Sequence, residues 1–303
     1  MAGSHRRIAV HDDRRRVRSR SGRLPGPSGF FLFPGALLLA FLLAWPAAGR
    51  PEPKSATKEP ADPGEISLFD GKSLDGWSGD SRYWSVIDGA ITGRTDIPLE
   101  ENTYLIREGT FSDFEARLKY RFLTEIGNSG LQYRGRGIEG KPFVVRGYQA
   151  NIVTTHADRT FAMLWEDEAR ELLALYGETV EIFAAANPSG ETFERRVTGT
   201  VNSKAEIMAA ARHYPEWNEH IVIAYGNRLI HALNGMVTLE AIDNDEASRS
   251  LAGAFALQIH RDMAMAVQFK DITVRELKTE PDIAQRFVRR HTTRHANSSD
   301  ASP

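Results

Sequence analysis

Three stretches of alternating sequence place hydrogen-bonding side chains where an exposed sheet face would ordinarily carry Lys, Glu or Thr. These side chains are Gln132 and Arg134, Gln149 and Asn151, and Gln258 and His260. Glycine and alanine share the same faces and would leave space between them. Amide, guanidinium and imidazole groups offer donors and acceptors of fixed direction, which suit a polyol better than a charged ligand. The pattern predicts a sugar-binding face, with an ordinary polar face as the alternative.

A second candidate for chemistry is the acidic run Glu166, Asp167 and Glu168, which Arg170 follows. Carboxylates at this density can supply a general base or bind a hard cation such as Ca²⁺. The same spacing also fits a solvated helix face with an i,i+4 pair between Glu166 and Arg170. Spacing alone favours that structural interpretation.

Other chemistries have weaker support or none. Trp77, Trp84, Trp165 and Trp217 could stack on the C–H face of a pyranose, although most tryptophans are packing residues. The sequence has no Ser/His/Asp order, phosphate loop, HExxH motif or zinc-ligand spacing. It also has no cysteine, which excludes disulfides and thiolate metal sites. The spacing of residues therefore indicates only a sugar-binding protein.

The elements that would position these residues are strands. From Phe114 to Phe122 apolar and charged residues alternate strictly, as in a half-buried strand with a solvated outer face. Farther along, Gly226 and Asn227, and then Asn234 and Gly235, separate short apolar runs, which is typical of two-residue hairpin turns. The chain is therefore predicted to be an all-β antiparallel sandwich.

One or two short surface helices are expected beside the strands. Ser203 and Glu206 form a capping-box pattern that predicts a helix over 204–212. Residues 161–176 have apolar positions at helical spacing and, taken alone, predict a second helix.

The two ends of the chain differ from the middle. Residues 1–49 combine eight arginines, an apolar run and small residues near Ala48 and Gly49, which indicates a signal peptide; a retained anchor is the alternative. Residues 50–64 read as a proline-rich linker, 65–277 as the folded domain, and 278–303 as a disordered polar tail. An exported protein, periplasmic or extracellular, is expected, with membrane contact only through an uncleaved N-terminal segment.

The net charge of −2 hides an asymmetry, because the first 49 residues hold eight arginines against two aspartates. The remainder is therefore acidic. Such a domain repels phosphate backbones, which argues against a nucleic-acid partner.

Several motifs together resemble one bacterial family. They are 68–77 (LFDGKSLDGW), 84–89 (WSVIDG), 114–121, 127–134 (GNSGLQYR), 147–152 (GYQANI) and 257–260 (LQIH). In this order they resemble the 3-keto-disaccharide hydrolase domain, also described as 3-keto-glucoside 1,2-lyase/3-keto-2-hydroxy-glucal hydratase, over about residues 66–277. The resemblance implies a concanavalin-like jelly roll. It also implies that Leu164–Ala174 lies on or beside a strand, which disputes the helix over 161–176.

The resemblance implies a 3-keto-glycoside substrate and a specific chemistry. A keto group at C3 acidifies the C2 proton, so a base can remove it and the C1 substituent leaves by β-elimination; hydration then completes a net hydrolysis. The expected base is His260, with Glu166 or Asp167 next. The expected substrate-binding residues are Arg134, Gln149, Asn151, Asn128, Gln258, Arg170 and Trp165. A bound Ca²⁺ could polarise the ketone, but no set of residues can be identified from the sequence as its ligands.

Departures from the family pattern leave two other functions open. Arg261, Asp262 and Met263 follow His260 where relatives often have Gly or Pro, and Asn151 stands where many have Asp or Gln. A non-catalytic carbohydrate-binding module on the same fold is the main alternative. An ordinary two-carboxylate glycoside hydrolase ranks below it, because no clear carboxylate pair emerges.

Overall fold

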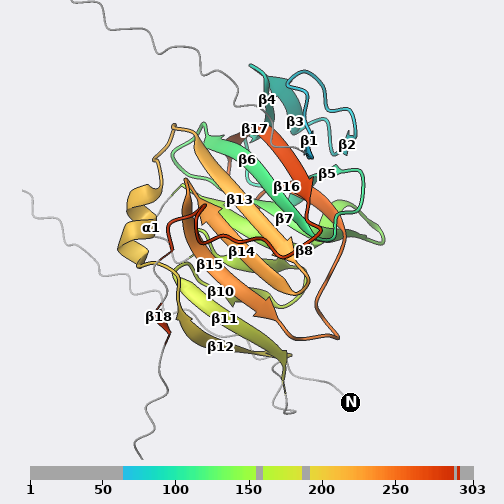
Figure 1. Cartoon of the computed structure of the whole chain (residues 1–303). Coiled ribbons are helices and arrows are strands. Elements are labelled where there is room, and N and C mark those ends of the chain that lie inside the picture. The colour runs from blue at the N-terminus through green and yellow to red at the C-terminus, as the bar shows by residue number, and fades with distance from the viewer. Residues whose placement is uncertain (1–63, 155–159, 186–191, 290–291, 294–303) are drawn as a thin grey trace, which may run out of the picture. The chain divides into compact units, whose positions relative to one another are not determined.

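The computed structural model describes residues 64–154, 160–185, 192–289 and 292–293, which form two packed β-sheets (Figure 1). The predicted signal peptide and all of the predicted linker except Gly64 lie outside these residues. Within the described part, no helix is long and apolar enough to cross a membrane.

The larger sheet, sheet A, has eleven strands in the order β18-β12-β11-β15-β14-β13-β6-β17-β4-β3, with β1 also paired to β17. Every pairing in it is antiparallel except that of β11 with β15. Its strands are β1 (Glu65–Ser67), β3 (Trp84–Ile87), β4 (Ala90–Thr95), β6 (Phe114–Phe122), β11 (Glu178–Ala184), β12 (Phe193–Thr200), β13 (Asn218–Tyr225), β14 (Arg228–Leu233), β15 (Met236–Asp243), β17 (Met265–Glu276) and β18 (Thr292–Thr293).

The smaller sheet, sheet B, is antiparallel throughout and has the strand order β10-β9-β8-β7-β16-β5-β2. Its strands are β2 (Trp77–Ser78), β5 (Thr103–Arg107), β7 (Asn128–Ile138), β8 (Lys141–Val153), β9 (Leu164–Asp167), β10 (Glu171–Ala174) and β16 (Ala254–Ile259).

The core lies between the sheets and follows the two-residue period. On β6, the apolar positions from Phe114 to Phe122 are buried, whereas Arg117 and Lys119 are partly exposed on the outer face. Sheet B contributes Leu131 and Tyr133 to the same core. The predicted all-β sandwich is therefore confirmed.

A single helix, α1 (Lys204–Ala210), is present among the described residues. The Ser203 side chain accepts the backbone N–H of Glu206, and the Glu206 carboxylate accepts the backbone N–H of Ser203. The capping box predicted from the sequence is confirmed, and Ile207 anchors the helix in the core.

The helix expected over 161–176 is wrong, because this segment forms the hairpin of β9 and β10. Glu168 and Glu171 have positive φ angles of 56° and 65°, which reverse the chain between the strands. Leu164 and Leu173 pack in the core from the two strands. Pairing of β9 with β8 outweighs the helical spacing of the apolar residues.

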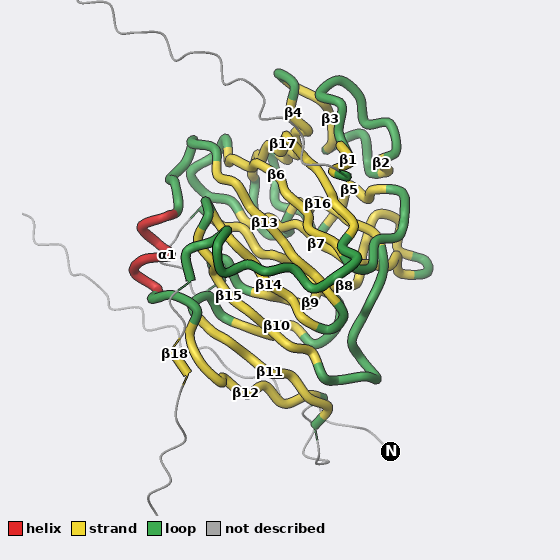
Figure 2. The backbone as a smooth tube through the Cα atoms, viewed as in Figure 1, coloured by secondary structure: helices red, strands yellow, loops and turns green. Residues whose placement is uncertain are grey.

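The predicted disordered tail over 278–303 is wrong for residues 278–289, which cross the outer face of sheet A over β13 and β14 (dark red in Figure 1, and Figure 2). Ile283 and Phe287, only 4% and 7% exposed, pack on apolar side chains of that face such as Ile221 and Ile230. Arg286 forms an ion pair with Glu115 at 2.5 Å. Apolar burial thus orders a segment whose average composition is polar. Residues 294–303 lie outside the described part.

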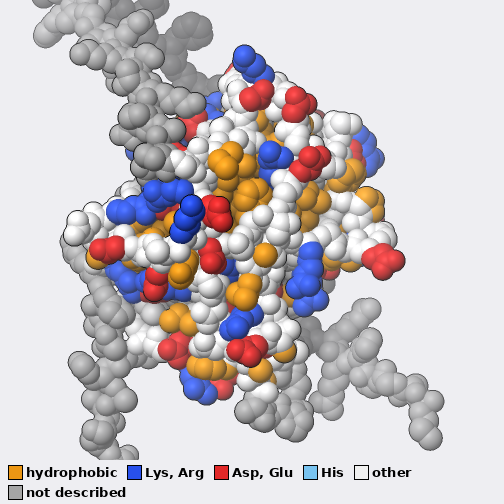
Figure 3. Space-filling view, turned by 45° about the vertical axis from the view of Figure 1, so that its right-hand side comes forward, with side chains coloured by type: hydrophobic (Ala, Val, Ile, Leu, Met, Phe, Trp, Pro, Cys, Tyr) orange, Lys and Arg blue, Asp and Glu red, His pale blue; other side chains and the backbone are white. Residues whose placement is uncertain are grey.

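Charged side chains of both signs surround smaller hydrophobic patches on the face shown in Figure 3. Surface charges also pair between elements, such as Lys119 with Asp271 at 2.9 Å. Pairs as exposed as this one contribute little to stability.

Candidate functional site

Four of the six polar side chains predicted to form a face lie together on sheet B, namely Gln132, Gln149, Asn151 and Gln258. Strand pairing places Gln132 opposite Gln149, and Gln258 opposite Tyr104. Each residue alternates with core residues of its own strand, so its side chain points away from sheet A.

Asp167 on β9 is the centre of this polar face. Its Oδ2 accepts hydrogen bonds from the Tyr104 hydroxyl at 2.5 Å, from Gln132 Nε2 at 2.9 Å and from Gln258 Nε2 at 2.9 Å. Its Oδ1 accepts from the indole N–H of Trp165 at 3.0 Å. The carboxylate is therefore held by four neutral donors, and no cation is among them.

The contact between Tyr104 and Asp167 requires a strongly curved sheet. Three strands, β8, β7 and β16, lie between β9 and β5 in the strand order. Four strand spacings correspond to about 19 Å of flat sheet, which two side chains cannot span. Sheet B must therefore roll its polar face inward, and the proximity of β5 to β8 agrees with this curvature.

A second group of amides fills the inside of the roll. Gln149 Nε2 donates to Asn151 Oδ1 at 2.9 Å and to Gln258 Oε1 at 3.2 Å, and Asn151 Nδ2 donates to the carbonyl of Thr160. A side chain at Gly130 would come within 2.5 Å of Gln149. The space that Gly130 leaves is thus occupied by the protein's own glutamine rather than open to a sugar.

The buried tyrosine remains a donor at all ordinary pH values. Burial raises the pKa of Tyr104 well above its usual value, and the neighbouring charge of Asp167 and the hydrogen bond to it raise it further. The Gln132 Oε1 atom is buried without a hydrogen-bond partner.

A pocket of about 350 Å³ opens beside Asp167, with Trp165 also on its wall. Asn102 before β5, Lys141 on β8 and Arg261 after β16 line it from other elements. Asp167 is 8% exposed, so the pocket reaches it while the amides behind it stay covered. The volume lies within the range of small-ligand sites.

His260, the base expected from the sequence, lies half-buried just after the end of β16. Its Nδ1 is 2.6 Å from the carbonyl oxygen of Arg261. Because a carbonyl only accepts, Nδ1 carries the proton. The neighbouring Arg261, rather than His260, lines the pocket.

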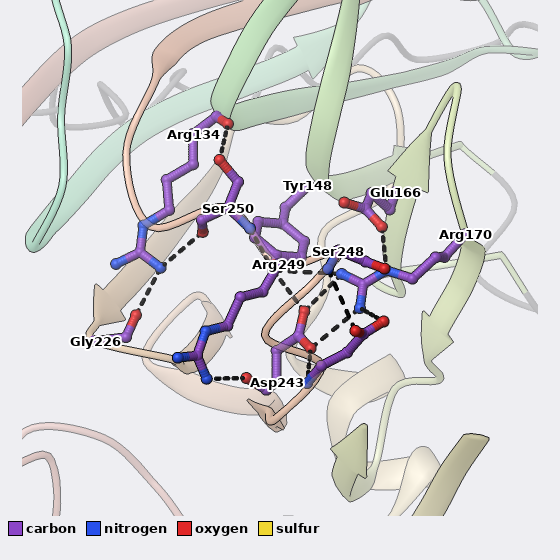
Figure 4. Close-up of polar contacts among 10 residues, drawn as sticks. Arg134, Tyr148, Glu166, Arg170, Gly226, Asp243, Ser248, Arg249 and Ser250 are labelled. Atoms are coloured by element: carbon purple, nitrogen blue, oxygen red, sulfur yellow. Dashed lines mark hydrogen bonds and ion pairs between the residues drawn. The ribbon is translucent and has the colours of Figure 1, made fainter. Parts of the chain in front are cut away.

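Glu166 and Arg170 lie on the core side of β9, where Arg170 contacts both Glu166 and Asp243 (Figure 4), and neither of them lines the pocket. Arg170 binds Glu166 at 2.5 Å, Asp243 at 2.6 Å and Asp245 at 3.3 Å. Burial lowers the pKa of Arg170, but hydrogen bonds and charges from Asp243 and Glu166 outweigh it and raise the pKa overall. This buried cluster ties β9 to the end of β15 and does not touch Asp167.

Arg134 is also turned away from the polar face. Its φ of 50° falls where the pairing of β7 is irregular, and such a bulge reverses the direction of a side chain. The buried guanidinium donates to the carbonyls of Ser112, Gly226 and Ser250, bracing loops at one end of the sandwich (Figure 4). Arg134 therefore lies apart from Asp167.

Asn128 occupies the polar face at the far end of β7. It pairs with Val153, four residues along the strand from Gln132, a separation of about 13 Å. The structure thus brings together Asp167, Trp165, Gln149, Asn151 and Gln258, and leaves Glu166, Arg170, Arg134 and Asn128 elsewhere.

Tyr104, Asn102 and Lys141 were missed as site residues. Tyr104 begins the short apolar run 104–106, and we did not assign it to the polar face from the sequence. Asn102 connects the groups: its Oδ1 accepts the backbone N–H of Arg261, and its Nδ2 lies 3.4 Å from the Tyr104 hydroxyl.

No group of three or more His, Cys, Asp or Glu side chains in the described residues could hold a metal ion. The Asp167 oxygens face N–H and O–H donors, which repel a cation. The residues around Asp167 therefore do not fit Ca²⁺.

Comparison with known proteins agrees with the resemblance seen in the sequence. A 3-keto-disaccharide hydrolase of Bacteroides thetaiotaomicron is 24% identical over 197 residues, which are 58% of this chain and 58% of that protein. The chain thus matches little more than half the length of this relative.

Among solved structures, a glycosyl hydrolase candidate from Parabacteroides distasonis matches 71% of this chain and 95% of its own, with 19% identity and a TM-score of 0.46. The carbohydrate binding module CBM66 of Bacillus subtilis matches 66% and 96%, with 16% identity and a TM-score of 0.43. Residues 64–275 match the family described as the 3-keto-alpha-glucoside-1,2-lyase-like domain. Because this match covers most of the chain, the protein belongs to that family.

Proposed function

We propose that the protein cleaves 3-keto-glycosides by elimination and hydration in the pocket beside Asp167. The observation that carries the proposal is the placement of one carboxylate, fixed by four hydrogen bonds, at the wall of a pocket of about 350 Å³. Family membership and the name of the Bacteroides relative support the substrate class.

In the proposed reaction Asp167 takes the C2 proton of the 3-keto sugar. The electron pair moves toward the C3 carbonyl, and Lys141 and Asn102, which line the same pocket, supply N–H donors for the enolate oxygen. The C1–O bond then breaks, and the departing oxygen takes a proton from solvent. This step leaves a C1–C2 double bond.

Water completes the cycle by adding its hydroxyl to C1 and releasing its proton to solvent. The carboxyl proton of Asp167 exchanges with solvent, and Asp167 then protonates C2. The net change is hydrolysis of the glycosidic bond, and the carboxylate is regenerated. Trp165, partly exposed on the pocket wall, offers a ring face for the sugar.

Asp167 is assigned the role of base in place of His260 because of where the two side chains lie. Asp167 lines the pocket, whereas His260 is not among the residues that line it. Glu166 is excluded from this role by its buried ion pair with Arg170 on the other side of β9.

A binding-only function is the second candidate, and one observation favours it. All four hydrogen bonds to Asp167 come from the protein itself, so the carboxylate is well satisfied before any substrate arrives. Proton uptake by such a carboxylate must displace one of its donors, whereas a carboxylate with a free lone pair needs no such displacement. In this case a sugar would bind in the pocket without turnover.

The test uses the full chain with 3-keto-trehalose and a chromogenic 3-keto-glucoside, beside their unoxidised counterparts. Release of the aglycone from the keto substrates alone supports the proposal. Asp167→Asn should lower kcat by about 10²- to 10⁴-fold. Asp75→Asn, at an exposed position outside the pocket, should leave it unchanged. Binding of keto sugars without any turnover by the unmodified protein would instead support the binding module.

We also propose that the protein acts after export, on the strength of its arginine-rich and apolar N-terminal segment. Cell fractionation with an antibody against the folded domain tests this. Recovery of the domain only from the cytoplasm would contradict export.

A further inference from the structure

The mouth of the pocket carries an excess of negative charge. Four of its lining residues are acidic, namely Glu101, Asp167, Glu168 and Glu171, while Lys141 and Arg261 are its basic ones. Asp167 lies at the wall beside the polar face, and the other carboxylates are more exposed. A substrate that enters the pocket must therefore pass this rim.

Each of the two basic residues of the pocket already has an acidic partner. Lys141 pairs with Glu101 at 3.3 Å, and Arg261 pairs with Asp262 at 3.3 Å. The carboxylates of Glu168 and Glu171, by contrast, form no ion pair or hydrogen bond within the described residues. The uncompensated charges at the rim thus come from a single hairpin turn, between β9 and β10.

The position of these two carboxylates is fixed from the opposite side of the sheet. Arg170 lies between them in the turn, and its guanidinium is buried against Glu166, Asp243 and Asp245 (Figure 4). Because the Arg170 side chain is held on the core side of the turn, Glu168 and Glu171 remain on the side of the pocket, which both of them line. The turn cannot easily swing its charge away from a ligand.

We infer that the pocket selects glycosides that carry an amino group close to the cleaved bond and discriminates against anionic ones, such as those with a carboxylate or phosphate. An ammonium group at the mouth would face Glu168 and Glu171 without losing contact with water. An anion there would meet the same charges with no free cation among the described lining residues. This inference rests on the proposed function, because it concerns the same pocket.

Three 3-keto-glucosides test the inference, with 4-(aminomethyl)phenyl, 4-(hydroxymethyl)phenyl and 4-(carboxymethyl)phenyl aglycones. Their leaving groups are similar, whereas their charges are positive, zero and negative. The expected order of kcat/KM is cation above neutral above anion. Exposed charge pairs are worth up to about fivefold each, so the cation-to-anion ratio should be roughly tenfold. It should shrink as salt is added.

The double variant Glu168→Gln/Glu171→Gln should bring the cation-to-anion ratio close to one while turnover of the neutral substrate stays within about twofold. Glu216→Gln, at an exposed position before β13, is the matched control and should keep the full ratio. Equal kcat/KM values for the three substrates, or a ratio that survives in the double variant, would overturn the inference.

Failure of the proposed function would look different, because no keto substrate would then be turned over. The charge preference is in that case read from the dissociation constants of the three unoxidised glucosides, measured by calorimetry with the full chain. The cationic glucoside should bind severalfold more tightly than the anionic one. Equal dissociation constants would contradict the inference independently of turnover.

Discussion

Glu166 and Asp167 are consecutive residues of β9 whose carboxylates lie on opposite sides of sheet B. Glu166 forms a buried ion pair with Arg170 at 2.5 Å, whereas Asp167 accepts four neutral donors beside the pocket. The strand alternation separates a structural acid from a candidate catalytic one within a single dipeptide.

The first prediction compares amide variants of this pair. Glu166→Gln should keep kcat within about threefold of the unmodified protein but lower the free energy of unfolding by about 1–3 kcal/mol, because Arg170 loses one of its charged partners. Urea unfolding and turnover of a chromogenic 3-keto-glucoside check both values. A large loss of kcat in a stably folded Glu166→Gln protein would contradict the separation of roles.

The second prediction concerns Tyr104, whose hydroxyl donates to Asp167 at 2.5 Å. Tyr104→Phe removes one of the four donors that hold the Asp167 carboxylate, so kcat should fall by about three- to tenfold. Burial and the charge of Asp167 hold the pKa of Tyr104 well above its usual value, so its hydroxyl stays a donor throughout the assay range. Equal turnover of a chromogenic 3-keto-glucoside by Tyr104→Phe and the unmodified protein would show that Tyr104 does not act on the base.

The third prediction uses two histidines in the core. His220 on β13 has both ring nitrogens buried without a partner, and His231 on β14 contacts the Tyr133 hydroxyl through Nε2 at 2.9 Å. Burial lowers the pKa of His220 to about 4, and burial together with the nearby His220 lowers the pKa of His231 further below its usual value.

Protonation of these histidines therefore favours the unfolded chain. Above pH 6.5 both states are neutral, so the histidines impose no pH dependence; as the pH falls from 6.5 toward 4, the unfolded state takes up protons first and stability is lost. The contribution of His220 between pH 7 and 4.5 is about 2–3 kcal/mol. Denaturant unfolding at both pH values should show a smaller loss for His220→Leu. An equal loss would contradict the assignment.

The fourth prediction concerns the segment 278–289 on the outer face of sheet A. Phe287→Ala should lower the free energy of unfolding by about 2–4 kcal/mol, because the ring packs in an apolar cluster and is 7% exposed. Val288→Ala is the control, since that side chain is 49% exposed and should change stability by less than about 0.5 kcal/mol. Equal effects of the two variants on the free energy of unfolding would show that packing of this segment on the outer face of sheet A does not stabilise the fold.

The sandwich could be predicted from the sequence because its signals are local. The alternation from Phe114 to Phe122 defines a buried and an exposed face without knowledge of the partner strand. The capping box at Ser203 and Glu206 likewise depends on four neighbouring residues. Both signals depend only on residues that are close together in the sequence, so they can be recognised before the fold is known.

The site could be predicted only in part, because its remaining features depend on distant pairings. Gln149, Asn151 and Gln258 share a face as their strand alternation indicates. The curvature that brings Tyr104 to Asp167 joins β5 to β9, and no local pattern encodes it. The bulge at Arg134 reverses one side chain within a regular alternation.

The most direct test of the account follows the C2 position of a 3-keto-glucoside deuterated there. Loss of deuterium to solvent and release of the aglycone are measured for the unmodified protein, Asp167→Asn and His260→Ala. We predict that Asp167→Asn, while folded, loses both by at least about 10²-fold, whereas His260→Ala keeps most of each. Normal deuterium loss in Asp167→Asn, or its abolition in His260→Ala, would contradict Asp167 as the base.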